Sequence, residues 1–216
     1  MPFIVKNTTF PNFLDLVFPH SCRGCGLIGE PFCERCKNHI IKSHQNLCFN
    51  LKSSSPIYIL GERSGILGDL IHDYKYYSIR ALARPLAEML NEILPKDLPK
   101  NSVVVPLPTA THHIRARGLD HTYLIAKHLA KIRHYKLERI LLRAKNTVQV
   151  GSNRSDRLTQ AKSAYIKNPK CKINKDTTYI LLDDVWTTGA SIKAATKLLQ
   201  QAGGKNIVVA VLTYSS

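Results

Sequence analysis

The sequence has few acidic residues and no long apolar run, and both shortages limit what the chain can be. No apolar segment approaches the roughly 20 residues that a helix needs to cross a bilayer, so we expect no transmembrane helix. The one apolar stretch near the N-terminus contains Pro11 and Asp15, which is unlike a secretory signal peptide. A cytoplasmic protein is the simplest expectation.

The shortage of acidic residues leaves a large positive charge. The chain has 31 Lys and Arg against 15 Asp and Glu, a formal net charge of +16. Residues 111–163 alone hold 12 Lys or Arg against 3 acidic residues. Charge clustered in this way favours a polyanionic partner, with nucleic acid ahead of an acidic membrane surface. A hydrated surface that only keeps the protein soluble is the alternative.

The chain divides near residue 55. Five of the six cysteines precede that point, and residues 52–56, with three consecutive serines, are typical of a linker. A length of 216 residues suits one substantial domain plus a small module. We therefore expect a small module over residues 1–55 and a larger domain over residues 56–216, without internal repeats.

Helical and strand patterns alternate after residue 56. Apolar spacing predicts helices over residues 65–94 (interrupted at 74–78), 118–132 and 190–202, the last ending at Gly203 and Gly204. Short apolar runs predict strands over residues 102–106, 137–142, 179–183 and 207–212. The alternation predicts an α/β fold with a mostly parallel sheet and flanking helices. Ligands of such sheets bind beyond the carboxyl ends of the strands.

Two Cys-x2-Cys pairs lie close together in the first module. Seven residues separate the pairs, which are formed by Cys22, Cys25, Cys33 and Cys36. Four thiolates at this spacing suit a tetrahedral Zn²⁺ site that is closed and structural, because no position is left for a substrate. Unbound thiols, disulfides and an iron–sulfur cluster are the alternatives, although disulfides are disfavoured in a cytosolic chain. Cys48 and Cys171 have no partner at metal-binding spacing.

Residues 179–191 carry the most informative pattern. A buried-type strand leads into Asp183 and Asp184, and a turn rich in hydroxyl groups and glycine then opens a helix. Carboxylates at a strand end can accept hydrogen bonds from ribose hydroxyls or hold Mg²⁺. The turn offers backbone N–H groups and a helix N-terminus to a phosphate. It is not a Walker A loop, because no Gly-Lys-Ser/Thr follows; an ordinary strand–turn–helix is the alternative.

This pattern resembles the signature of the type I phosphoribosyltransferases, which bind phosphoribosyl pyrophosphate (PRPP) there. The resemblance implies that Asp183 and Asp184 face the ribose and that the turn wraps the 5′-phosphate. The turn residues are Thr187, Thr188, Gly189, Ala190 and Ser191. Mg²⁺ is the implied companion of the pyrophosphate.

Further motifs follow one another in a specific order. They are residues 14–36 around the cysteine pairs, residues 68–76 ending in Lys75 and Tyr76, residues 104–108 (Val-Val-Pro-Leu-Pro) and residues 115–118 (Arg-Ala-Arg-Gly). Together with residues 183–191, they resemble the ComF/ComFC family of bacterial competence proteins over nearly the whole chain. That family joins a zinc segment to a phosphoribosyltransferase-like domain. Its mobile loop matches Arg143, Thr147, Gln149 and Arg157.

The resemblance also implies how the pyrophosphate is held. Backbone N–H groups of residues 106–108 are candidates, and Arg115 and Arg117, expected in a loop before a helix, could reach one phosphate cluster. Guanidinium groups suit phosphate geometry, and Lys75 is a further candidate. Leu-Asp-His at residues 119–121 replaces the family's Phe-Asn-Gln. No catalytic base is identifiable; the nearby histidines, expected to be exposed and without function, are His112, His113 and His121.

The leading hypothesis is therefore a competence protein that binds PRPP and handles incoming single-stranded DNA. An active phosphoribosyltransferase with an unidentified acceptor is the alternative, and a zinc-bearing interaction module with an idle PRPP site is a third. The resemblance implies a DNA-import helicase and a DNA-loading protein as partners, with a possible peripheral position at the inner membrane. Five tyrosines are candidates for stacking on bases, and serve equally well at a core edge: Tyr74, Tyr76, Tyr77, Tyr123 and Tyr135.

Overall fold

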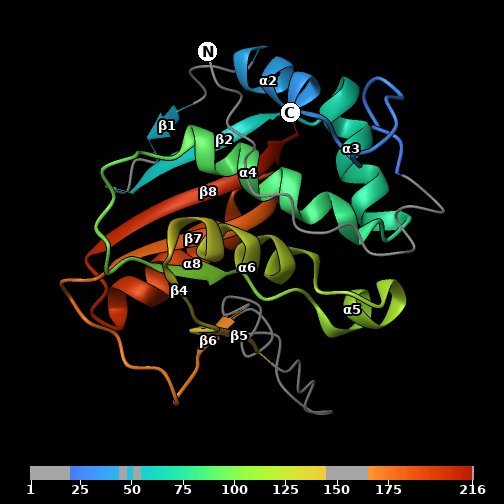
Figure 1. The fold of residues 1–216 in the computed structure, drawn as a ribbon. Helices are drawn as coiled ribbons and strands as arrows, with labels where there is room; N and C mark the ends of the chain where they lie inside the picture. The colour runs from blue at the N-terminus through green and yellow to red at the C-terminus, as the bar shows by residue number, and fades with distance from the viewer. Residues whose placement is uncertain (1–19, 44–47, 51–54, 145–164, 216) are drawn as a thin grey trace.

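A six-stranded sheet organises the computed structural model, which describes residues 20–43, 48–50, 55–144 and 165–215. In spatial order the strands are β1 (Cys48–Asn50), β2 (Pro56–Glu62), β8 (Asn206–Tyr214), β7 (Thr178–Trp186), β3 (Val103–Pro106) and β4 (Lys136–Leu137) (Figure 1). All neighbouring pairs are parallel except β1 and β2, which are antiparallel at one edge. The predicted mostly parallel sheet is confirmed.

The central strands are apolar on both faces because helices cover both sides of the sheet. Ile180 and Leu182 of β7 belong to one buried cluster, and Tyr179 and Leu181 belong to the other. This period of two assigns alternate side chains of the strand to opposite faces. The continuous apolar runs that predicted β3, β7 and β8 are therefore the sequence pattern of strands buried on both faces.

Among the described residues, five helical elements lie against the first face of the sheet and one helix lies against the second. The first face carries α2 (Glu34–Ser43), α3 (Gly65–Tyr76), η1 (Arg80–Leu82), α4 (Ala83–Ile93) and α6 (His121–Arg133) (Figure 1). The second face carries α8 (Ala190–Gln201), whose Ile192 and Leu199 pack beneath Val209. No helix among the described residues is long and apolar enough to span a membrane.

Two crossovers leave the sheet from the neighbouring strands β3 and β7 in opposite directions. From β3 the chain passes through α6 on the first face to β4 at the edge. From β7 it passes through α8 on the second face to β8 on the other side. Such a point, where the connections diverge, is where ligands of open α/β sheets bind. Residues 106–108 and 183–191 meet there.

The helix predicted over residues 65–94 is present with its interruption. It becomes α3, η1 and α4, and the break includes Ser78, whose φ of 52° is left-handed. The single strand predicted over residues 137–142 is wrong. Its first part is β4, and the chain then turns into β5 (Leu141–Arg143), which pairs with β6 (Tyr165–Lys167) in a separate sheet. Leu137 and Leu141 pack into different apolar clusters, which splits the run.

The cysteine segment packs against the larger sheet rather than standing apart from it. Phe32 and Ile40 belong to the same buried cluster as Leu86 of α4, and β1 pairs with β2. Neither α2 nor β1 was expected from the sequence. A division of the chain at residue 55 stays a prediction, and most of the proposed linker, residues 51–54, lies outside the described residues.

Candidate functional site

The acidic pair lies at the carboxyl end of β7, next to a lysine from the end of α3. The Nζ atom of Lys75 is 2.7 Å from an Oδ atom of Asp184, and the Lys75 side chain is only 10% exposed. Packing of the buried Tyr74 and Ile71 sets the last turn of α3 against the core, which directs Lys75 inward. The structure thus brings together two predicted PRPP residues that are far apart in the sequence.

Asp183 is the more protected of the two carboxyl groups. Burial, together with the neighbouring charge of Asp184, raises the pKa of Asp183 to about 7. The backbone N–H of Asp184 donates a 2.9 Å hydrogen bond to Asp183 Oδ1, which favours the charged form. Asp183 can therefore exchange a proton near neutral pH, while Asp184 is paired with Lys75.

The turn after β7 has a shape that only glycine fits at one position. Gly189 has a φ of 69°, in the left-handed region that other residues avoid. A Cβ atom there would also overlap the indole ring of Trp186. Thr187 and Thr188 are exposed, and α8 begins at Ala190. An exposed, hydroxyl-bearing turn at the N-terminus of a helix suits a phosphate group.

We expect Gly189→Ala to destabilise the protein by more than Gly118→Ala does. Gly118 has nearly the same φ, 66°, but open space around its Cα. Both variants carry the left-handed penalty of roughly 1–2 kcal/mol, and only Gly189→Ala adds the overlap with Trp186. Melting temperatures of both variants measure the difference. Equal losses would show that contact with Trp186 does not fix the turn.

The two arginines of the Arg-Ala-Arg-Gly motif were expected in a loop, and this expectation is wrong. They lie in a short helix, α5 (Thr111–Arg117). At its start, the N–H groups of His113 and Ile114 donate hydrogen bonds to the carbonyl of Ala110. Residues two apart on a helix do not face the same side. Arg115 is exposed, and Arg117 is half-buried above the ring of Tyr76. A shared phosphate contact therefore no longer follows from their spacing.

The backbone of residues 106–108 has no free N–H group. The two prolines have none, and the N–H of Leu107 donates a 2.9 Å hydrogen bond to the carbonyl of Leu182. The expectation that this segment donates backbone N–H groups to a pyrophosphate is wrong. Its role in the fold is to join the end of β3 to β7.

Tyr165 and Arg143 reach the site from the small sheet of β5 and β6. Burial, opposed by a hydrogen bond with Ser191, raises the pKa of Tyr165, and the charges of Asp183 and Asp184 raise it further. The guanidinium of Arg143 lies 5.7 Å from the centre of the Tyr165 ring. No sequence motif indicated Tyr165 as a site residue. Arg143 was matched to the family's mobile loop, whose other residues, Thr147, Gln149 and Arg157, lie outside the described residues.

The segment that departs from the family motif has a structural role. Asp120 caps α6 by accepting a 3.2 Å hydrogen bond from the N–H of Tyr123. His121 was expected to be exposed, but it is buried. Its ring meets the ring of Tyr74 edge-on, and the Tyr74 hydroxyl donates a hydrogen bond to the His121 carbonyl. Neither ring nitrogen of His121 has a hydrogen-bond partner among the described residues, and burial lowers its pKa. His112 and His113 are exposed, as expected.

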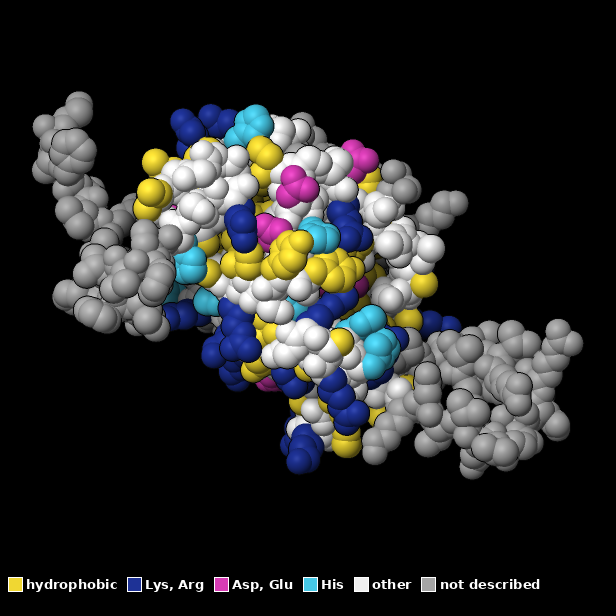
Figure 2. All heavy atoms as spheres, turned by 90° about the vertical axis from the view of Figure 1, so that its right-hand side faces the viewer, with side chains coloured by type: hydrophobic (Ala, Val, Ile, Leu, Met, Phe, Trp, Pro, Cys, Tyr) yellow, Lys and Arg dark blue, Asp and Glu magenta, His cyan; other side chains and the backbone are white. Residues whose placement is uncertain are grey.

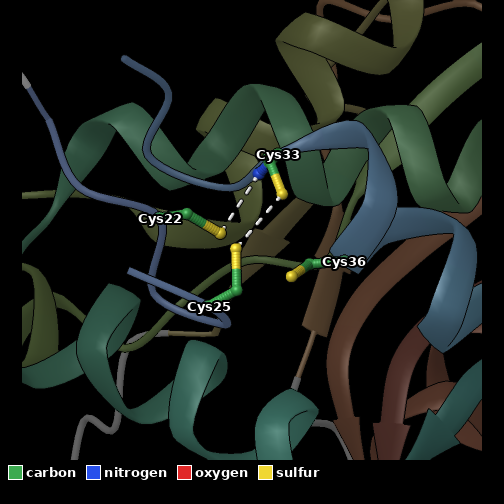
Figure 3. A group of neighbouring side chains, drawn as sticks. All are labelled: Cys22, Cys25, Cys33 and Cys36. Atoms are coloured by element: carbon green, nitrogen blue, oxygen red, sulfur yellow. Dashed lines mark hydrogen bonds between the residues drawn. The ribbon is translucent and has the colours of Figure 1, made fainter. Parts of the chain in front are cut away.

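The four cysteines of the N-terminal segment converge on one point (Figure 3). Their sulfur atoms all lie within 4.8 Å of one another, and those of Cys25 and Cys33 are 3.7 Å apart. A tetrahedron with Zn–S bonds of 2.3 Å has edges of about 3.8 Å. The N–H groups of Gly24 and Cys33 donate to the sulfur of Cys22. Burial would raise the pKa of Cys22, but backbone donors lower it to about 6.

Gly24 allows the first cysteine pair to approach the second. A Cβ atom at this position would lie 2.7 Å from the sulfur of Cys36 and 3.1 Å from the ring of Phe32. The donor set is four sulfurs at near-tetrahedral spacing, three of them buried, with backbone donors that favour the thiolate form. These residues fit a four-thiolate Zn²⁺ ion.

Comparison with known proteins gives three similar competence proteins, although no family model matches the chain. Competence protein ComFC of Streptococcus pneumoniae is 28% identical over 64% of this chain and 59% of its own length. ComFC of Bacillus subtilis is 23% identical over 83% and 72%. Competence protein F of Haemophilus influenzae is 26% identical over 87% of each chain. The resemblance to the ComF/ComFC family that the motifs predicted is thus supported by three relatives at 23–28% identity.

Two solved structures are also similar to this chain, each at 14% identity. One is the allosteric regulatory enzyme of purine biosynthesis, with a TM-score of 0.46 over 65% of this chain and 30% of that one. Another is a hypoxanthine phosphoribosyltransferase from Staphylococcus aureus, with a TM-score of 0.39 over 64% of each chain. The predicted α/β fold class is confirmed as a mostly parallel sheet with flanking helices and a cysteine cluster near the N-terminus.

Proposed function

We propose that this protein belongs to the ComF/ComFC family, binds PRPP with Mg²⁺ and handles single-stranded DNA in the cytoplasm during natural transformation. One observation carries the PRPP site: the pairing of Lys75 with Asp184 beside the 187–191 turn, at the point where the crossovers diverge. The competence role is proposed from the three relatives, the first of which this chain matches over 59% of its length.

In this proposal each part of PRPP meets a different part of the site. The 5′-phosphate binds the turn before α8, and the ribose hydroxyls donate to Asp183 and Asp184. The pyrophosphate needs cations, because the backbone of residues 106–108 offers no donor. Lys75 is the buried candidate. The charge of Arg143 opposes the rise in the pKa of Tyr165 and that of Arg117 helps to lower the pKa of His121, so both guanidinium groups lie near the site. Mg²⁺ would supply the remaining positive charge.

The single tryptophan of the chain makes PRPP binding directly measurable. Trp186 packs against Gly189 inside the proposed phosphate turn, so its indole ring would sense a ligand there. We expect PRPP with Mg²⁺ to change the fluorescence of Trp186 saturably. Ribose 5-phosphate, which lacks the pyrophosphate, is expected to bind more weakly, because it cannot use the cations. A flat titration with PRPP, supported by calorimetry without heat, would refute the site.

DNA binding is expected to weaken steeply with salt. The net charge of +16 predicts that phosphate contacts dominate the affinity for single-stranded oligonucleotides. The logarithm of the association constant should then fall against the logarithm of salt concentration, with a slope of about −0.7 per phosphate contacted. Fluorescence anisotropy of a labelled 20-mer measures the slope. A salt-independent affinity, or no binding near physiological salt, contradicts the DNA part of the proposal.

One observation favours the second candidate, an active phosphoribosyltransferase. Asp183 has a pKa of about 7, which is close to that of an efficient general base at neutral pH. A group of this kind could take a proton from an acceptor nucleophile while the pyrophosphate leaves. Release of pyrophosphate in the presence of candidate bases and amines tests this function. Binding without release under all these conditions leaves the protein a PRPP-binding competence factor.

A further inference from the structure

Exposed aromatic side chains gather at the end of α3. Tyr76 and Tyr77 are 54% and 68% exposed, and the side chain of His72, one turn earlier, is 52% exposed. Figure 2 views the molecule from the side of α3 and α5 and shows hydrophobic side chains at the surface among Lys, Arg and His. We name His72, Tyr76 and Tyr77 the aromatic platform. Rings of this size, exposed together, are typical of an interaction surface.

The three rings contact one another. The ring centres of His72 and Tyr76 are 4.9 Å apart, as expected for residues four apart on one helix face. His72 also meets Tyr77 edge-on at 5.5 Å. The helix ends at Tyr76, and after its C-cap residue Tyr77 the chain turns at Ser78, whose φ of 52° is left-handed. The rings are thus held by one another and by the helix end, while their outer faces remain exposed.

Cationic side chains from α5 and η1 surround the platform. The guanidinium of Arg117 lies 5.2 Å from the centre of the Tyr76 ring. The Ser78 hydroxyl donates to the Arg117 carbonyl at 3.0 Å, which ties the end of α5 to the end of α3. Arg80 donates to the Gly118 carbonyl at 3.4 Å and is exposed. The guanidinium of Arg117 is therefore positioned beside the rings, and that of Arg80 bonds Gly118, the residue that follows Arg117.

The acidic residue nearest the platform along α3 is already paired. Asp73 precedes Tyr76 by three residues, and its carboxylate lies 3.2 Å from the Nε atom of Arg23. Arg115 of α5 is exposed and adds a further positive charge. Arg117, Arg80 and Arg115 thus outnumber the two carboxylates of α3 closest in sequence to the platform, the exposed Asp69 and the Arg23-paired Asp73.

The other tyrosines of the chain are buried or half-buried. Tyr74 is fully buried, and its hydroxyl is bonded to His121. The ring of Tyr123 is covered by Arg139 at 3.9 Å, and the hydroxyl of the half-buried Tyr135 donates to the Leu98 carbonyl. Among the nine tyrosines, Tyr76 and Tyr77 are the two whose rings are exposed.

We propose that the aromatic platform stacks on the bases of single-stranded nucleic acid, while Arg117, Arg115 and Arg80 hold its phosphates. This inference rests on the proposed DNA handling and assigns it to a place on the surface. Rings interleaved with cations bind single strands with little sequence preference, because every base has a flat face. Lys75 points inward to Asp184, and Tyr76, the next residue, is exposed, so the strand would lie beside the PRPP site.

An abasic oligonucleotide separates stacking from phosphate binding. The full chain is titrated with a fluorescent 20-mer of thymidine and with an abasic 20-mer that carries the same phosphates. We expect the wild-type protein to prefer the thymidine strand. Tyr76→Ala and Tyr77→Ala should weaken thymidine binding by roughly 5- to 100-fold each, with unchanged abasic binding and an unchanged salt slope. Arg115→Ala and Arg80→Ala should instead reduce the salt slope.

Conservative and distant substitutions complete the test. Tyr76→Phe and Tyr77→Phe keep the ring and should retain wild-type affinity. Ile166→Ala removes another exposed apolar side chain, on β6, and should have no effect. A PRPP-dependent change in Trp186 fluorescence shows that each variant is folded.

Two results overturn the inference in different ways. If the wild-type protein binds both strands equally, or the Tyr→Ala variants keep their preference for thymidine, DNA is held elsewhere or by its phosphates alone. The platform is then the docking surface of another partner, such as a protein. If the wild-type protein binds neither strand at low salt, the proposed DNA handling fails as well.

Discussion

Replacing Asp183 and Asp184 together by Asn is expected to weaken Mg²⁺-dependent PRPP binding by about 100-fold or more. Hydrogen bonds to a charged group contribute about 1.5–3 kcal/mol each, and the double variant removes the charge from both acceptors. Asn retains the size of Asp, but Asp184→Asn also removes the charged partner of Lys75, which adds to the expected loss if Lys75 holds the pyrophosphate. Calorimetry and Trp186 fluorescence measure the affinity.

The same strand supplies a matched control for this experiment. Asp176 is exposed in the turn that precedes β7, so it lies near the amino end of this strand, whereas the proposed site lies at the carboxyl end. Asp176→Asn changes the net charge in the same direction as each of the site substitutions, but it is expected to leave PRPP affinity unchanged. Unchanged affinity in the Asp183 and Asp184 variant would refute the assignment of the ribose site. Equal losses in both variants would indicate an effect of overall charge.

Loss of one cysteine of the cluster is expected to remove the metal and lower the melting temperature by about 10 °C or more. Structural zinc contributes about 10–16 kcal/mol to small sites, and about 1 kcal/mol shifts the melting temperature of a chain of this size by 2–4 °C. Cys33→Ser is the sharpest variant, because Cys33 is buried and its sulfur lies 3.7 Å from that of Cys25. Metal analysis should find one zinc per wild-type chain and none in the variant.

Cys171→Ser controls for the loss of a thiol in general. Cys171 is half-buried, and its sulfur lies 3.8 Å from the Arg139 carbonyl, outside the cluster. We expect this variant to retain zinc and nearly all of its stability. Wild-type protein that binds iron would overturn the identity of the metal. Wild-type protein that keeps its melting temperature after complete removal of zinc would overturn the structural role of the site.

The parts of the site that the sequence predicted are those encoded by neighbouring residues. Asp183, Asp184 and the glycine-containing turn follow one another along the chain, and a buried strand before them and a helix after them fix their direction. The cysteine pairs are similarly local. Long apolar runs predicted β3, β7 and β8 because both faces of these strands are covered.

The features that escaped prediction depend on contacts between distant segments. The strand β6 has three residues and α5 has seven, which is too short for a reliable periodic pattern. Tyr165 lies at the site because β5 and β6 pair beside α8, and no local signal indicates this. The burial of His121 likewise depends on its contact with Tyr74 from another helix. Composition does not distinguish such a histidine from an exposed one.

The ion pair between Arg23 and Asp73 joins the cysteine cluster to the helix that positions Lys75. Arg23 lies between Cys22 and Cys25, and Asp73 precedes Lys75 by two residues in α3. If bound metal helps to order α3 through this ion pair, it also helps to hold Lys75 at the proposed PRPP site. Metal binding would therefore increase the affinity for PRPP. By thermodynamic reciprocity, bound PRPP would retain the metal more tightly by the same factor. Starvation for zinc would then reduce ligand occupancy before the protein unfolds.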